Sequence, residues 1–161
     1  MAAIAQFHPL PVIGYPEAWY ARHIEMAHEA GDRHATASYK VGQYVTLGLR
    51  HDKTWDEKLK CFRHALKHYC CAPAETDAGL RDFYRKLQDL VHRQAGHEAV
   101  RLARVESDAW AMRKEIGVDP AALEDEADLF FATLCGHCDG CPDWCSKEAW
   151  SQLCAIRDKW I

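Results

Sequence analysis

Hydrophobic residues recur along most of this 161-residue chain at intervals of three and four, which is the period of an amphipathic helix. The clearest pattern runs from about Asp77 to Gly96, where the apolar positions are Leu80, Phe83, Tyr84, Leu87, Leu90 and Val91. Only residues 43–47 have a composition typical of a strand, and no second run accompanies them as a pairing partner. The pattern therefore predicts an all-α protein.

Capping residues, prolines and glycines divide this pattern into about seven helices. The predicted helices cover residues 16–30, 32–50, 55–72, 77–96, 97–116 and 120–134, and a last one begins near residue 146. Asp32, Asp119 and Ser146 are suited to cap three of them, and residues 54–57 (TWDE) have the spacing of a capping box. Gly96 is expected to end or kink the fourth helix.

Short links between these helices favour a helical bundle or stacked α-hairpins of about six to seven helices. The helix pair predicted over residues 33–71 resembles one tetratricopeptide unit, but the pattern does not recur at a fixed period. The sequence therefore predicts a single helical domain over residues 1–161, with a cysteine-rich segment at residues 135–145 between the last two helices.

The apolar residues of each predicted helix are expected to lie in the core. In the third helix they are Trp55, Leu59, Phe62, Leu66 and Tyr69. The fifth helix has a less regular set, namely Val100, Leu102, Val105, Trp110 and Met112. Cys70 and Cys154 are also expected in the core, because a free cysteine often behaves as a small buried hydrophobic residue.

Composition and charge narrow the class of protein. Hydrophobic residues make up 48% of the chain and include six Trp, which is enough for a substantial core. The formal net charge of −4 gives no general attraction to nucleic acid or anionic membranes, and no apolar run is long enough to span a bilayer. The N-terminus MAAIAQFHPLPVIGYP has no basic region, and prolines interrupt its apolar stretch. We therefore expect no signal peptide and a cytoplasmic location.

Eight cysteines without a secretion signal indicate metal or redox chemistry rather than a disulfide framework. Four of them, Cys135, Cys138, Cys141 and Cys145, lie within the eleven residues CGHCDGCPDWC, which we call the cysteine knot. Their C-x2-C-x2-C-x3-C spacing resembles the cluster-binding run of bacterial ferredoxins. The proline here follows the third cysteine instead of the fourth, and the chain has no second run. The resemblance therefore implies a cluster-binding loop and no ferredoxin fold.

Two cofactors suit the cysteine knot, because thiolate sulfur is the soft ligand of both iron–sulfur clusters and zinc. A [4Fe–4S] cluster is preferred, since it accepts ligands that stand farther apart. Zinc is the alternative, and His137 is then able to replace one cysteine. A metal-free linker with free or disulfide-paired thiols is the third possibility. Residues 118–146 contain seven carboxylates and no Lys or Arg, which predicts a low reduction potential for a cluster there.

The ten histidines offer further candidates. Cys61, His64, His68 and Cys71 fall on one stripe of the third predicted helix, where the two histidines are four residues apart. These histidines, with Cys61 or Cys71, are a second candidate metal site, although a solvated helix flank is the favoured interpretation. His23 falls on the apolar face of the first helix and is expected to be a hydrogen-bonded core residue.

Three functions are compatible with these features. The first is a small metal-binding protein with a [4Fe–4S] cluster that serves as a redox module, a regulator or an accessory to a larger metalloenzyme. The second is a helical protein-interaction module with a structural zinc site. The third is a metalloenzyme, for which the sequence indicates no substrate. The expected partner is another protein: residues 50–68 carry six Lys or Arg against three acids and suit an acidic surface, whereas nucleic acid is not expected.

Overall fold

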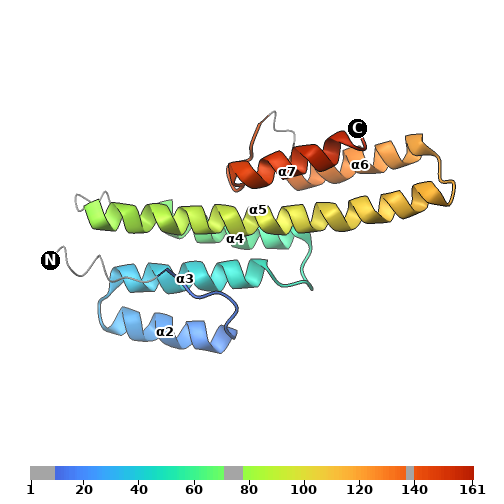
Figure 1. Cartoon of the computed structure of the whole chain (residues 1–161). Helices are drawn as coiled ribbons and strands as arrows, with labels where there is room; N and C mark the ends of the chain where they lie inside the picture. The colour runs from blue at the N-terminus through green and yellow to red at the C-terminus, as the bar shows by residue number, and fades with distance from the viewer. Residues whose placement is uncertain (1–9, 71–77, 137–139) are drawn as a thin grey trace. The chain divides into compact units, whose positions relative to one another are not determined.

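The structure is a computed structural model that describes residues 10–70, 78–136 and 140–161, and it describes their side chains except at residues 68–70. Its helices are α2 (Glu17–Glu29), α3 (Arg33–Gly48), α4 (Trp55–Cys70), α5 (Ala78–Glu115), α6 (Pro120–Cys135) and α7 (Lys147–Asp158) (Figure 1). No strand occurs in these ranges, so the all-α prediction is confirmed for them. Residues 43–47, with their strand-like composition, lie inside α3. None of these six helices combines the length and the apolarity needed to cross a bilayer.

Most helices begin where the capping residues predict. The side chains of Asp32, Asp119 and Ser146 each accept a hydrogen bond from an amide in the first turn of the following helix. At the start of α4 the Thr54 hydroxyl accepts from the Glu57 amide at 3.3 Å, while the Glu57 carboxylate accepts from the Thr54 amide at 3.4 Å. This is the predicted capping box, and it satisfies amide groups that have no partner in the first helical turn.

The predicted helix boundary at Gly96 is wrong. α5 runs without a break from Ala78 to Glu115 and joins the fourth and fifth predicted helices. A glycine inside a helix costs about 1 kcal/mol relative to alanine, but here the missing side chain serves packing. A Cβ atom on Gly96 would lie 2.5 Å from the Ala149 Cβ and 3.4 Å from the Cys145 Sγ. The glycine therefore lets the start of α7 approach α5 closely.

The chain divides into two compact units, and their boundary lies inside α5, between Ala95 and Gly96. The first unit contains α2, α3, α4 and the beginning of α5, and within it α3 packs against both α2 and α4. Its buried side chains include Tyr20, Val41, Val45, Phe62, Phe83, Leu87 and Val91. The second unit contains the rest of α5 with α6 and α7, and it carries the cysteine knot. The single folding domain stays a prediction.

One charged side chain of the first unit lies in its core. Lys58 is 1% exposed, and its ammonium group donates to the carbonyl oxygens of Gly48, at 3.4 Å, and of Arg50. These carbonyls lie at the C-terminal end of α3, where backbone acceptors lack a helical partner and a cation is favoured. Lys58 therefore does not belong to the basic surface predicted over residues 50–68.

The core of the second unit is rich in aromatic side chains. The Trp110 ring lies roughly edge-on to the rings of Phe130 and Trp160, with centroids 5.6 Å apart in each pair. The Trp160 indole N–H donates to the Ser107 hydroxyl at 2.9 Å, which ties the C-terminal residues to α5. Other buried side chains are Val100, Leu123, Phe131, Leu134, Trp144, Leu153 and Ile156.

Two residues predicted in the core of the fifth helix are exposed. Val105 is 54% and Met112 is 69% exposed, whereas Ala103 and Trp110 are buried. Each exposed residue follows a buried one by two positions, which is about 200° around a helix. The apolar set predicted for this segment thus spans two opposite faces, and only one of them meets α6 and α7.

Candidate metal centre

The cysteine knot connects the end of α6 to the start of α7, within the second unit. Cys135 is the last residue of α6 and is buried. Gly136 follows with φ of 69°, a left-handed conformation that turns the chain away from the helix. Residues 137–139 lie outside the described part. The Cys145 amide then donates to the Pro142 carbonyl at 3.1 Å, which closes a turn immediately before α7. A helix end and a turn therefore position the described cysteines.

The three described cysteines of the knot lie close together. The Cys141 thiol donates to the Cys145 carbonyl oxygen at 3.3 Å, and the Cys145 thiol donates to the Ser146 carbonyl oxygen, also at 3.3 Å. Cys135 is near enough for its charge to act on Cys145. All three are free thiols. The fold thus brings together three of the four predicted ligands, and the fourth, Cys138, lies outside the described residues.

Burial disfavours ionisation of the Cys141 and Cys145 thiols. It raises the pKa of Cys145 to about 12, and the charges of Cys141 and Cys135 add to the rise because thiolates repel one another. Burial also raises the pKa of Cys141, although the hydrogen bond from Cys145 and the charge of Lys147 oppose that rise. Both groups are therefore protonated at neutral pH in the metal-free protein, and a cation that binds them must displace their protons.

Within the described part of the chain, no three His, Cys, Asp or Glu side chains already stand in an arrangement that holds a metal ion. Two predicted ligands, Cys138 and His137, lie outside that part. The donors that are described suit a soft metal, since all three, Cys135, Cys141 and Cys145, are thiols. Coordination requires Cys141 and Cys145 to exchange their hydrogen bonds for bonds to one centre.

The second half of the knot is anchored in the core. Trp144 is 2% exposed, and Pro142 is also buried. The Cys145 Sγ packs beside Gly96 of α5, where a larger residue would collide with the start of α7. Packing of Pro142, Trp144 and Cys145 therefore contributes to the position of this half of the knot, whereas the Cys141 side chain is exposed.

Most of the carboxylates predicted around the knot are distant from it. On α6, which rises 1.5 Å per residue, Asp128 lies about 10 Å and Glu124 about 16 Å along the axis from Cys135. Glu126 pairs with Arg113, whose guanidinium nitrogen lies 2.8 Å from its carboxylate oxygen. Water and salt screen exposed charges at such distances. Among these described carboxylates, Asp143 is therefore the one expected to lower the reduction potential of a cluster in the knot.

A further thiol lies near the knot. Cys154, predicted in the core, is half-buried on α7, and its Sγ is 3.9 Å from a guanidinium nitrogen of Arg157. Its charge acts on both Cys141 and Cys145. Helical spacing puts Cys154 on the same face as Trp150, one turn away, and so predicts a core residue. This spacing gives no signal that the turn before α7 brings other thiols close. The other cysteine predicted in the core, Cys70, lies outside the described side chains.

The second candidate site, on α4, is only partly within the described residues. Cys61 is half-buried, and this burial raises its pKa. His64 is exposed and stacks on Tyr44 of α3, with ring centroids 5.3 Å apart. The side chains of His68 and Cys71 lie outside the described part. His64 therefore has a packing partner on α3, and the metal site on α4 stays a prediction.

His23 is hydrogen-bonded, as its position on the apolar face predicts. Its Nδ1 lies 2.8 Å from the Trp19 carbonyl oxygen, and its ring stacks on the Trp19 indole with centroids 3.8 Å apart. The side chain is half-buried rather than fully enclosed. These contacts make it a packing residue of α2.

No protein-family model, curated protein or solved structure matches this chain significantly. The described thiols of the knot are therefore the chemical feature on which a proposed function rests.

Proposed function

We propose that this protein binds a metal through the cysteine knot, with Cys135, Cys138, Cys141 and Cys145 as its ligands. The observation that supports the proposal most is the presence of three free thiols in one part of the second unit, with Cys135 at the end of α6 and Cys141 and Cys145 just before α7. Sulfur donors so close together favour soft cations over magnesium or calcium, which prefer oxygen.

The preferred bound group is a [4Fe–4S] cluster, which the C-x2-C-x2-C-x3-C spacing supports. With a cluster, the protein is a redox or regulatory module, or an accessory to a larger metalloenzyme. The cluster supplies one-electron chemistry, and the chain's own residues hold it and limit its contact with water. Buried Trp144 and Pro142 suit the second of these tasks.

Zinc is the alternative, and one observation favours it. The Cys141 Sγ lies 3.3 Å from the Cys145 carbonyl oxygen, so the two cysteines stand close together. Tetrahedral zinc, with Zn–S bonds of about 2.3 Å, holds its sulfur atoms about 3.8 Å apart, whereas a cluster binds its thiolates at different irons. With zinc, the metal clamps the end of α6 to the start of α7, and the protein is a helical interaction module.

The proposed partner is another protein in both cases. Lys60, Arg63 and Lys67 are exposed on α4 and follow one another by three and four residues, so they share one face. This face is smaller than the basic stripe predicted from the sequence, because Lys58 is buried and Arg50 pairs with an acidic neighbour at 2.8 Å. An acidic protein surface suits three exposed cations on one helix face.

Elemental analysis of anaerobically purified protein tests the proposal and identifies the metal. About four irons and four sulfides per chain, with absorption near 400 nm, are expected for the cluster. One zinc per chain without sulfide supports the structural alternative. Protein that contains neither, even after reconstitution with iron and sulfide or with zinc, contradicts metal binding.

A further inference from the structure

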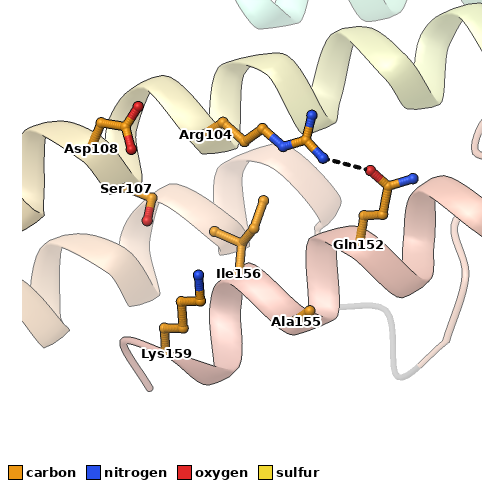
Figure 2. Close-up of a pocket in the computed structure, with 7 residues that line it drawn as sticks. All are labelled: Arg104, Ser107, Asp108, Gln152, Ala155, Ile156 and Lys159. Carbon is orange, nitrogen blue, oxygen red and sulfur yellow. Dashed lines mark hydrogen bonds between the residues drawn. The ribbon is translucent and has the colours of Figure 1, made fainter.

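A second site lies within the same unit, in the groove between the last part of α5 and α7. A hollow of about 260 Å³ is lined there by Arg104, Ser107, Asp108, Gln152, Ala155, Ile156 and Lys159 (Figure 2). An adjoining hollow of about 420 Å³ shares Arg104, Asp108 and Gln152 with it. The two hollows therefore form one continuous groove, and none of its lining residues is a ligand of the proposed metal centre.

Hydrogen-bond donors predominate in the lining of the first hollow. Arg104 donates one N–H to the Gln152 Oε1 at 2.9 Å, which leaves its other N–H groups and the Gln152 amide NH2 as donors. Ser107 accepts from the Trp160 indole at 2.9 Å, so its hydroxyl hydrogen remains to be donated. No side chain in the described part of the chain pairs with Lys159. Four donor side chains therefore line one space, and three of them, Arg104, Gln152 and Ser107, are held by bonds that the protein already makes.

The charge of the lining is positive on balance. Arg104 and Lys159 are cations, and Asp108 is the one carboxylate among the lining residues. In the adjoining hollow Arg101 is already engaged with Glu98 through two hydrogen bonds, of 3.0 and 2.6 Å. Guanidinium, ammonium and hydroxyl donors around one space are the groups by which proteins bind carboxylate and phosphate.

The adjoining hollow adds apolar surface. Val100 forms part of its floor and Val105, which is 54% exposed, forms part of its rim. An apolar side chain that stays exposed beside a donor-rich hollow gives a bound molecule surface to cover. The groove thus offers a polar end and an apolar end to one ligand.

We propose that this groove binds a small organic acid, with its carboxylate or phosphate group held by Arg104, Lys159 and Ser107 and its apolar body against Val100 and Val105. Asp108 repels a simple anion, so it favours a ligand that carries a hydrogen-bond donor beside the oxyanion. This proposal does not depend on whether the cysteine knot binds a metal.

Amide-shift titration of the ¹⁵N-labelled full chain tests this site, with sodium phosphate and sodium acetate as the two probes at constant ionic strength. Saturable shifts are expected around residues 104–108 and 152–159. Lys159→Gln and Arg104→Gln each remove a charged donor and should weaken binding by about tenfold. Asp108→Asn removes the repulsion and should strengthen it. A response to phosphate alone assigns a phosphate ligand, and a response to acetate alone assigns a carboxylate.

Lys114→Gln is the matched control, because Lys114 is an exposed cation on α5 outside the groove. Arg104 and Lys159 are themselves exposed, so their substitution leaves the core unchanged. Equal effects of Lys114→Gln and Lys159→Gln, shifts spread over all surface cations, or no saturable shift would each overturn the proposal.

Discussion

Cys145 combines the properties that determine what the knot can do. Its side chain is buried, its carbonyl oxygen accepts a hydrogen bond from the Cys141 thiol at 3.3 Å, and burial raises the pKa of its own thiol to about 12. The thiolate, rather than the thiol, is the nucleophile of cysteine enzymes, so this group is a poor nucleophile at neutral pH. A metal ion replaces the proton and removes that obstacle. Metal binding therefore suits Cys145 better than covalent catalysis does.

Metal binding is expected to release protons from the knot. Because burial raises the pKa of both Cys141 and Cys145, each must lose a proton at pH 7 before it binds as a thiolate. The affinity for zinc should therefore rise with pH between about pH 6 and pH 9. Calorimetric titration with zinc in two buffers of different ionisation enthalpy should show at least two protons released per ion. Binding without proton release would mean that other residues hold the zinc.

Two cysteines compete for the role of fourth sulfur ligand. Cys138 has the spacing of the predicted run, whereas Cys154 lies near enough for its charge to act on Cys141 and Cys145. We predict that Cys138→Ser loses the bound metal and that Cys154→Ala retains it, as measured by elemental analysis of the purified variants. The opposite result would make Cys154 the ligand and would overturn its assignment as a packing residue.

At the level of the helices, local sequence signals predicted most helix starts correctly. They wrongly predicted a helix boundary at Gly96, inside α5. A capping box or an N-cap depends on two or three neighbouring residues, so Thr54 with Glu57 and the Asp119 cap could be recognised from sequence. Gly96 was misread because its role depends on Ala149, more than fifty residues away. Lys58 was assigned to the surface for the same reason, since its partners are carbonyl groups at the end of α3.

Gly96→Ala tests the packing of α5 against the start of α7. By helix propensity alone, this change should stabilise α5 by about 1 kcal/mol. The added Cβ would lie 2.5 Å from the Ala149 Cβ, so we expect a net destabilisation of about 1–3 kcal/mol. Chemical denaturation of metal-free protein measures the change. Gly140→Ala, where a Cβ meets no atom within 4 Å, is the control and should have little effect. A more stable Gly96→Ala protein would disprove this close contact.

At the scale of the molecule, the predicted all-α class is confirmed for the described residues, whereas the division into two units could not be predicted from the sequence. The boundary falls between Ala95 and Gly96 inside an unbroken helix, and no linker marks it. Likewise, the spacing of the knot predicts that its four cysteines share one metal, and that stays a prediction because Cys138 lies outside the described residues. This spacing could not show that Cys154 lies near them, because that proximity depends on the turn that precedes α7.

Loss of the metal should loosen the second unit more than the first. α7 has only twelve residues, and an isolated helix of that length is marginal in water. A metal bound to the knot fixes the turn before α7 and so stabilises the packing of Leu153. The double variant Cys138→Ser/Cys141→Ser should show faster amide exchange after about residue 132, while residues 55–67 and 78–95 stay protected. Equal protection of α7 in variant and wild type would show that the metal does not clamp this unit.

The most direct test of the account is the metal content of the knot variants after anaerobic purification and dialysis against a chelator. The wild type should keep its cofactor, either about four irons with four sulfides or about one zinc per chain. Cys138→Ser/Cys141→Ser should keep none. A double variant that retains as much metal as the wild type would contradict the claim that the cysteine knot is the metal centre.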